Sequence, residues 1–396
     1  MKKKAIALAI ASAMVAPNAF AAQDTSGMQY TSASEGFWAS LRVRWNSGEK
    51  DGESAASKHS AEIQNSGSRF GVRGSNDLGN GLVGFYAYEA GMDAENGGSL
   101  ETRQLHVGLR GNFGEVRAGS FWAAPYNMVY GSTDVANKQS ASLLVGSHVF
   151  PGRISRSVQY TTPNLNGFQG AVIASMVNDD RYDADENTVA NGENAVDYWA
   201  LAGSYSISGF TVAGTYNTRA DYTNVLLSDP DNDNSPIRAL IDQVAAIAEA
   251  DDDTTHSAQV ERGLNNDVDS WALRLAYEQD NWYVTSWYGE TNYSDVTYEY
   301  KSTTDGVETE VVQAASDPQL FSIAAGVAVD KVNLYAVYDS LENAEGADGA
   351  KDHYGTVGVQ YNLGSKSRVW IEYASQDLDT DADADDYVNI GLRHDF

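Results

Sequence analysis

The feature that most constrains this chain is an alternation of apolar and polar residues that recurs in stretches of about ten residues. Near the amino-terminal end, Arg42 and Arg44 alternate with Leu41, Val43 and Trp45. Successive side chains of a β-strand point to opposite faces, so this pattern predicts a strand with one apolar and one arginine-bearing face. The core of a soluble sandwich could not bury such arginines, whereas a membrane barrel directs apolar side chains to lipid and polar ones into an aqueous lumen. The alternation therefore predicts a transmembrane β-barrel.

Sixteen segments show this pattern, and short turns alternate with long polar loops between them. Short turns at one rim and long loops at the other are typical of outer-membrane barrels. A sheet of this size has to close in lipid, because an open edge would leave backbone groups unpaired. The sequence thus predicts an all-β, sixteen-stranded antiparallel transmembrane barrel with long external loops. The segments lie near residues 36–45, 67–74, 82–91, 102–110, 114–121, 155–162, 167–176, 197–205, 209–218, 269–278, 281–289, 320–328, 331–338, 354–362, 368–374 and 387–396.

The amino terminus has the three parts of a secretory signal peptide. Residues 2–4 are lysines, residues 5–16 form a short apolar stretch, and residues 19–21 give a small-x-small cleavage pattern. No later segment approaches the roughly 18 apolar residues that a transmembrane helix needs. We therefore expect residues 1–21 to be a cleaved signal peptide and residues 22–396 to form a single barrel domain.

Charge and composition disfavour several classes of function. The chain carries 55 acidic and 26 basic side chains, a formal net charge of −29, so nucleic acid would be repelled. It contains no cysteine, which removes disulfide scaffolds, thiolate zinc sites and thiol nucleophiles. The six histidines are scattered, and the motifs of zinc proteases, serine hydrolases and P-loop proteins are missing from the sequence. We expect neither catalysis nor a cofactor; an enzyme housed in a barrel and a surface adhesin or structural barrel are the alternatives.

The longest connection, about residues 219–268, is expected to be an external loop. Residues 236–250 have a helix-period apolar pattern, which predicts a short surface helix over the barrel mouth. Two stretches, residues 229–233 and 377–386, are acidic and low in complexity. They lack the glycine and the glutamate that an EF-hand loop requires, so we interpret them as solvated loops, with a weakly bound divalent cation as the alternative.

Several hairpin and terminal-strand segments share residue patterns with one known family: SRFGVRG at 68–74, DLGNGL at 77–82, VGLRGNFGEVRAG at 107–119, SVQY at 157–160, TPN at 162–164 and GLRHDF at 391–396. Together they resemble the Gram-negative general porins, and the resemblance spans the chain that follows the signal peptide. It implies a sixteen-stranded barrel, usually a homotrimer, whose third long loop folds inward and narrows the channel.

In this sequence the third long loop is about residues 122–152, and Asp134 is expected to cap a helix over residues 135–144. In the family, an acidic loop faces arginines on the barrel wall. Here the acidic side is reduced to Asp134, with Lys138 four residues later. The pore-lining and constriction residues that the resemblance implies are Arg42, Arg44, Arg69, Arg73, Arg110, Arg156, Trp122, Tyr126, Asp134 and Lys138.

The function implied by the resemblance is passive diffusion of small hydrophilic solutes and ions through a water-filled channel, with a substrate-preferring channel as the alternative. Phe396 matches the family's carboxyl-terminal signal for outer-membrane assembly. The implied partners are small polar solutes and ions, outer-membrane lipid and lipopolysaccharide, the barrel assembly machinery and further copies of the chain in a homotrimer. Nucleic acid is not expected as a partner. The implied location is the cell outer membrane.

Overall fold

A computed structural model describes most of the predicted strands of the 396-residue chain. The signal peptide, Lys138 and the surface helix expected at residues 236–250 lie outside the described residues. The structure describes residues 36–49, 59–92, 99–137, 152–176, 196, 198–219, 259–262, 268–293, 296–301, 308–313, 317–342, 351–377 and 385–396.

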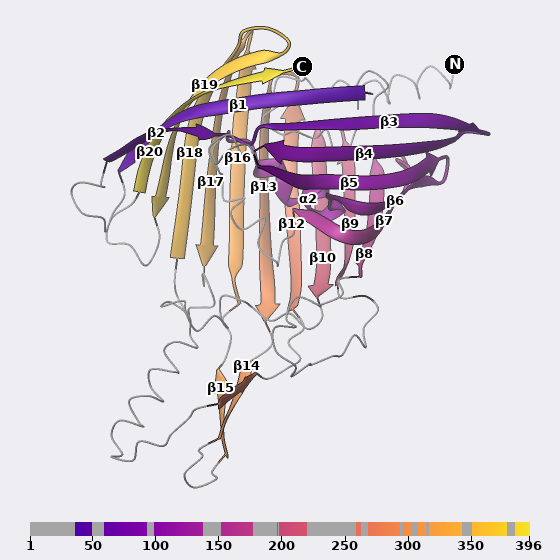
Figure 1. Cartoon of the computed structure of the whole chain (residues 1–396), viewed down its shortest axis with the longest axis vertical. Coiled ribbons are helices and arrows are strands. Elements are labelled where there is room, and N and C mark those ends of the chain that lie inside the picture. Colours follow the sequence, from indigo (N-terminus) through magenta and orange to yellow (C-terminus); the bar gives the residue numbers. More distant parts are fainter. Residues whose placement is uncertain are drawn as a thin grey trace.

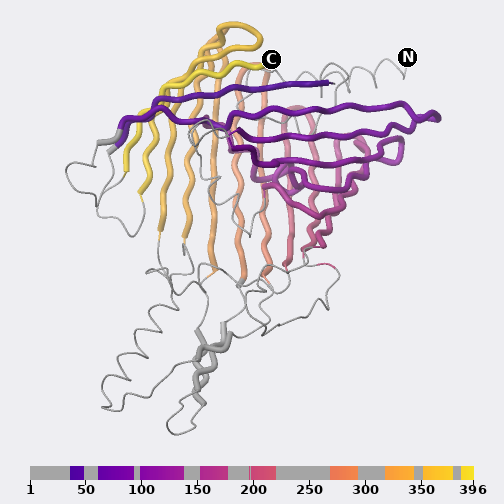
Figure 2. The backbone as a smooth tube through the Cα atoms, viewed as in Figure 1, coloured from indigo at the N-terminus to yellow at the C-terminus, as the bar shows by residue number. Residues whose placement is uncertain are grey.

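The fold is one large antiparallel sheet that closes on itself (Figures 1 and 2). Barrel strands that are consecutive along the chain pair with each other, and β20 pairs back onto β1 in a register that places Trp45 opposite Ile390. Closure leaves no unpaired edge, which confirms the predicted sixteen-stranded barrel. The barrel strands are β1 (Gly36–Glu49), β3 (Arg69–Gly79), β4 (Leu82–Met92), β5 (Leu100–Gly111), β6 (Gly114–Trp122), β7 (Arg153–Thr161), β8 (Phe168–Ser175), β9 (Tyr198–Ile207), β10 (Phe210–Arg219), β12 (Val268–Gln279), β13 (Trp282–Tyr293), β16 (Gln319–Val329), β17 (Val332–Glu342), β18 (Lys351–Asn362), β19 (Ser367–Asp377) and β20 (Asp385–Asp395).

Each of the sixteen predicted segments overlaps one of these strands. Short turns join alternate strand pairs at one end of the barrel, which we call the short-turn rim. In the turn between β9 and β10, Ser208 has a φ of 50° and Gly209 a φ of 86°. Two successive positive φ values match the right-handed twist of a two-residue hairpin, so the local sequence fixes the register of this strand pair.

The second barrel strand is built from two pieces. β2 (His59–Asn65) pairs with the end of β1 away from the short-turn rim, while β3 pairs with the end near that rim. The break between them is held by Arg42, whose backbone carbonyl accepts a bond from the Ser66 N–H at 3.0 Å and whose N–H donates to Ser68 Oγ at 2.9 Å. The prediction placed a strand at residues 67–74 and missed β2.

The alternation distributes side chains as predicted, with apolar residues outside and polar residues inside. Leu275 is 62% exposed on the outer surface, where lipid would cover it, and Val107 is 61% exposed. On the inner face Glu372 is 1% exposed and Asn389 is fully buried. This arrangement is the inverse of a soluble protein, because the outer solvent is hydrocarbon and the interior is polar.

A smaller sheet was not predicted. It consists of β11 (Gln259–Arg262), β14 (Val296–Lys301) and β15 (Glu308–Gln313), with β14 in the middle and antiparallel to both neighbours. These strands belong to the connections between β10 and β12 and between β13 and β16. In the part of the chain that the structure describes, neither of the two helical segments has the length and apolar character to cross a membrane.

Candidate channel constriction

A short helical segment follows β6 into the barrel interior, where α2 lies in Figure 1. It consists of α2 (Ala124–Met128) and the 3-10 helix η4 (Tyr130–Thr133). Pro125 lies in the first turn of α2, where its fixed φ suits the helix and its missing N–H is not needed. Helical structure in this loop therefore begins directly after β6.

This start is earlier than the sequence predicted. Asp134 follows η4 with a φ of −75° and a ψ of 66°, and its N–H donates to the carbonyl of Gly131. It thus closes a helical segment and does not open one. The prediction that Asp134 caps a helix over residues 135–144 is wrong at the start of that range, because residues 135–137 are not helical. Residues 138–144 lie outside the described residues.

Small side chains on the inner wall make room for α2. Ala171 of β8, Ala202 of β9, Ala213 of β10 and Ala272 of β12 face inward and are at least 92% buried. A row of methyl groups leaves space on this wall that larger side chains would fill, and the helical segment occupies it. The loop residues packed on these alanines and their neighbours are Tyr126, Met128, Val129 and Tyr130.

Beyond α2, hydrogen bonds join the loop to the inner wall of the barrel. Arg274 Nη1 of β12 donates to the carbonyl of Met128 at 3.2 Å. Thr133 Oγ1 accepts bonds from Trp287 Nε1 of β13 at 2.9 Å and from Ser322 Oγ of β16 at 2.7 Å. The inward-facing donors of three successive wall strands therefore bind the backbone and the hydroxyl groups of the loop.

The last described residue of the loop, Asn137, is bound on the far side of the barrel. Its N–H donates to Glu372 Oε1 of β19 at 2.6 Å, and its Nδ2 donates to the hydroxyl of Tyr335 of β17 at 2.9 Å. Ser66, between β2 and β3, donates to the Asn137 carbonyl at 3.1 Å. Residues 123–137 thus follow the inner wall from β7 to β19, and the strands that complete the ring on the other side are β20, β1 and β3–β6.

Several arginines lie on this other side of the barrel, and two of them, Arg69 and Arg103, share Glu89 of β4 as a partner. Arg103 Nε lies 2.6 Å and Arg69 Nη1 lies 3.6 Å from Glu89 Oε1, while Gln104 Nε2 donates to Oε2 at 3.1 Å. By simple alternation Arg103 would point outward together with Leu105. A register shift between β4 and β5 at this position makes Arg103 an extra residue and brings it to Glu89.

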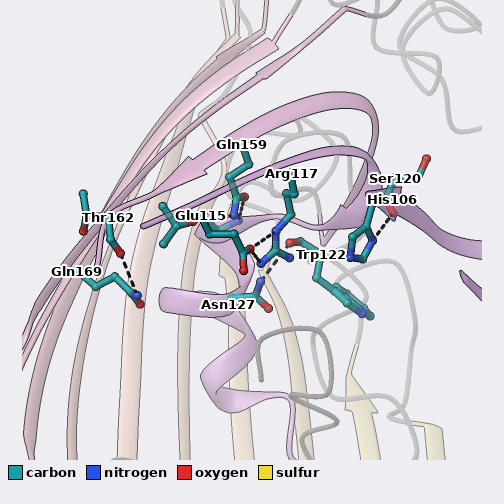
Figure 3. Close-up of polar contacts among 11 residues, drawn as sticks. His106, Glu115, Arg117, Ser120, Trp122, Asn127, Gln159, Thr162 and Gln169 are labelled. Carbon is teal, nitrogen blue, oxygen red and sulfur yellow. Dashed lines mark hydrogen bonds and ion pairs between the residues drawn. The ribbon is translucent and has the colours of Figure 1, made fainter. Parts of the chain in front are cut away.

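An aromatic stack secures the base of the loop. The rings of Trp122 and Tyr126 are stacked with centroids 4.3 Å apart, and the Arg153 guanidinium lies 5.4 Å from the Trp122 ring centroid. Asn127 Nδ2 donates to the Trp122 carbonyl at 3.1 Å (Figure 3). The Tyr126 hydroxyl donates to Asp134 Oδ2 at 2.6 Å. Burial, and then the Asp134 carboxylate, raise the pKa of Tyr126 well above its usual range, so the phenol remains a donor.

Two further pairs fix the wall beside the stack (Figure 3). Arg117 Nε donates to Glu115 Oε1 at 2.8 Å along β6. Gln159 of β7 accepts a bond from the Ala124 N–H at 2.9 Å through its Oε1, which satisfies a backbone donor at the start of α2. The loop is therefore bonded to β7 at its base and to β19 at its tip.

The predicted wall arginines differ in the side chains that they contact. Arg42 and Arg44 face the lumen from β1; Arg42 Nε donates to Ser40 Oγ at 2.9 Å, and Arg44 donates to Gln64 Oε1 at 3.0 and 2.8 Å. Arg69 is buried against Glu89. All three lie on β1 and β3.

The other three predicted arginines, Arg73, Arg110 and Arg156, have different surroundings. Arg73 lies over the ring of Trp38, and Arg110 over that of Phe85, each 5.6 Å from the centroid. Arg156 is exposed, has a φ of 52° and lies opposite a register shift between β6 and β7 that interrupts the alternation. Its role in lining the pore stays a prediction.

Two predicted residues remain, Lys138 and Phe396. Lys138 is outside the described residues. Phe396 is 56% exposed, and its N–H donates to the Ala39 carbonyl at 2.9 Å, so the carboxyl terminus continues the β1–β20 pairing. Within the described residues, no group of three or more metal-binding side chains occurs. Residues that the sequence did not single out for the site are Glu89, Arg103, Arg117, Asn137, Arg153, Tyr335 and Glu372.

Comparison with known proteins gives consistent matches. The profile of a family described as Gram-negative porin matches residues 7–298. The major outer membrane protein P.IB of Neisseria lactamica is 31% identical over 191 residues, which is 46% of this chain and 51% of that protein. The match to this relative thus spans about half of its length.

Two further comparisons cover more of the chain. Outer membrane porin F of Escherichia coli K12 is 22% identical over 351 residues, 83% of each chain. The solved structure of the anion-selective porin from Comamonas acidovorans has a TM-score of 0.61 at 17% identity and covers 91% of this chain and 98% of its own. At this identity the structural likeness shows the fold.

Proposed function

The chain belongs to the Gram-negative porin family, and from that membership we propose that it is an outer-membrane porin through which small hydrophilic solutes and ions diffuse passively. The observation that carries the proposal is the loop of residues 123–137, which is bonded along the inner wall of a closed barrel whose inward-facing side chains are largely polar. The named relatives are porins, which are channels and not enzymes. Solutes cross unchanged in this proposal, and no cofactor takes part.

We place the constriction between this loop and the wall formed by β1 and β3–β6. The loop contributes Asp134 as the acid of residues 123–137, and its carboxylate accepts a bond from Tyr126. The wall contributes Arg42 and Arg44, with Arg69 and Arg103 sharing Glu89. A passage lined by guanidinium groups on one side favours small anions at contact range.

The same proposal gives roles to the amino terminus, the longest loop, the outer surface and the carboxyl terminus. Residues 1–21 would be removed on export, and the external loop at about residues 219–268 would face outward. The apolar outer surface would contact lipid, lipopolysaccharide and, in a homotrimer, two further copies of the chain. Phe396, at the end of β20, would be read by the barrel assembly machinery.

A planar lipid bilayer tests the channel proposal. Purified, folded protein that migrates differently with and without heating is added to one chamber, and current is recorded at constant voltage. We expect stepwise increases in conductance, with three equal substeps per insertion if the chain is a homotrimer. Swelling of liposomes in sugars of increasing size would give the size limit.

A barrel that inserts but does not conduct would contradict the proposal. If folded protein inserts into the bilayer, as shown by protease protection, yet gives no conductance steps, the barrel is closed. The adhesin or structural alternative would then account for the chain. Heat-unfolded protein from the same preparation serves as the control for leaks caused by detergent.

A further inference from the structure

A row of inward-facing residues crosses the barrel wall where the tip of the loop is bound. Successive register partners in this row are Tyr283 of β13, Gly326 of β16, Tyr335 of β17, Gly358 of β18 and Glu372 of β19. Both tyrosines are 8% exposed, and Glu372 is 1% exposed. We call these five residues the tyrosine–glycine row, because each tyrosine in it is followed by a glycine on the next strand.

Each tyrosine ring of the row lies over the glycine that follows it. A Cβ added to Gly326 would lie 2.5 Å from Tyr283 Cε1, and a Cβ added to Gly358 would lie 2.5 Å from the hydroxyl oxygen of Tyr335. At both glycines the three atoms nearest to such a Cβ belong to the tyrosine side chain and not to the backbone. A larger residue at either position would therefore displace the ring from the wall into the lumen.

Gly358 also allows Tyr335 to reach Glu372. These two residues lie on strands that β18 separates, so their backbones are about 10 Å apart at ~4.8 Å per strand. The Tyr335 hydroxyl nevertheless donates to Glu372 Oε1 at 2.6 Å. This bond passes over Gly358, which is the register partner of both residues. A side chain at position 358 would stand between the donor and the acceptor.

The tip of the loop packs on these two rings. Val135 is 4% exposed and lies in one cluster with Tyr283 and Tyr335. Asn137 Nδ2 donates to the Tyr335 hydroxyl at 2.9 Å, and the Asn137 N–H donates to Glu372 Oε1 at 2.6 Å. The height of the two rings above the wall therefore sets how far residues 135–137 stand from β13–β19.

We propose that Gly326 and Gly358 are positioning residues for the channel constriction. Because they have no side chain, the rings of Tyr283 and Tyr335 lie flat against the wall, and the tip of the loop is held close to it while solutes pass on its other side. Protein interiors are close-packed, so a ring displaced by one methyl group would displace the loop residues that pack on it. The proposal rests on the channel function above, since the position of the loop limits solutes only in an open channel.

A spin label beside the tip of the loop tests the role of Gly358 without relying on conduction. The chain contains no cysteine, so Lys138→Cys, one residue after Asn137, gives a single attachment site. Gly358→Ala in the labelled protein should separate Tyr335 from Glu372. We expect the ratio of mobile to immobile label to rise about tenfold, the effect of losing one hydrogen bond to a charged group. In planar bilayers, Gly358→Ala in the unlabelled protein should lower the mean conductance and increase the open-channel noise.

Further variants make the test specific. Gly355→Ala, on the same strand, is the matched control, because a Cβ there would have nothing within 4 Å beyond its chain neighbours, and it should leave the label immobile. Tyr335→Ala removes the ring that Gly358 accommodates, so Gly358→Ala should add no further label mobility in that background. If Gly358→Ala does not fold, Gly326→Ala carries the same expectation, because it displaces the Tyr283 ring.

Two results would overturn the proposal. An effect of Gly355→Ala equal to that of Gly358→Ala would assign the change to the backbone of β18 and not to the ring. A further gain in label mobility when Gly358→Ala is added to Tyr335→Ala would show that the glycine does not act through that tyrosine.

Failure of this inference can be told apart from failure of the channel proposal. A chain that conducts, but whose label stays immobile in Gly358→Ala, refutes the positioning role and leaves the porin function intact. A folded, inserted chain that conducts nothing refutes the porin function itself, whatever the label shows. Heat-modifiable migration of each variant in electrophoresis shows that its barrel has folded.

Discussion

Asn137 and Glu372 are 235 positions apart in the sequence and are joined by a hydrogen bond of 2.6 Å from the Asn137 N–H to Glu372 Oε1. Glu372 also accepts the hydroxyl of Tyr335 at 2.6 Å, so a single buried carboxylate fixes the loop tip. The loop is held at its base by Gln159 and along its length by Arg274 and by Trp287, which donates to Thr133 of the loop. Its position across the lumen is therefore set by inward-facing polar side chains from many strands.

Glu372→Ala should release the loop tip. The variant loses three hydrogen bonds to the carboxylate, from the Asn137 N–H, from Asn137 Nδ2 and from the Tyr335 hydroxyl. A hydrogen bond to a charged group is worth about 1.5–3 kcal/mol. We expect larger open-channel current fluctuations and an altered conductance in planar bilayers. Glu372→Gln keeps an acceptor for the Asn137 N–H and should be closer to the parent. The control is Asn333→Ala, an inward-facing change on β17; equal noise in both variants would contradict the anchoring role.

Overpacking the alanine wall should displace α2. Ala213 is 2% exposed and lies beneath the loop, so Ala213→Leu adds volume where none is free, at a cost of about 1–3 kcal/mol. We expect a lower unfolding temperature and a changed conductance. Val212→Leu, one residue away on the lipid-facing side and 52% exposed, is the matched control and should change neither quantity. If both variants behave alike, α2 does not pack on this wall.

Tyr126→Phe should reveal the raised pKa of Tyr126. Below about pH 10 the phenol is protonated in both the folded and the unfolded chain, so its contribution to stability is constant. Above that pH the unfolded phenol loses its proton while the buried one keeps it, so the free energy of unfolding falls as pH rises. Denaturant unfolding at pH 9 and pH 11 should show this fall to be larger in the parent than in Tyr126→Phe. Identical falls would mean that Tyr126 is not buried.

Charge selectivity should depend on salt. The chain has a formal charge of −29, and exposed acids act over about 30 Å at 0.01 M salt but only about 3 Å at 1 M. Wall arginines such as Arg44 act at contact range at any salt. Reversal potentials at a fixed concentration ratio should therefore show a cation preference in dilute salt that declines as salt rises. Arg44→Gln should weaken the shift toward anions; a preference that grows more cationic with salt would contradict the constriction.

Deleting Phe396 should impair assembly in the outer membrane. The residue extends the β1–β20 pairing through its bond to Ala39, and its position matches the assembly signal of the family. We expect less folded, heat-modifiable protein in outer-membrane fractions, compared with a Phe396→Tyr control that keeps an aromatic terminus. Parent levels of folded protein from the truncated chain would refute the role.

The sequence by itself determined which residues form the barrel strands and which face of each strand meets lipid. Alternation is a local property with a period of two, so Leu41 and Arg42 are assigned to opposite faces without knowledge of any neighbour. The same alternation placed Arg44 and Arg69 in the lumen. It did not reveal β2, β11, β14 and β15, which are only four to seven residues long.

Only the tertiary structure decided how the lumen is filled. Arg103 turns inward because an extra residue enters β5 where it pairs with β4, and the position of such a bulge depends on two strands at once. Asn137 reaches Glu372 because four inward alanines leave space for α2 along the way. Arg42 lies opposite Arg393 because barrel closure sets β20 beside β1 in one register. The position of a bulge, the register in which β20 closes on β1, and the free volume of the lumen depend on several strands at once, so no single segment of sequence encodes them.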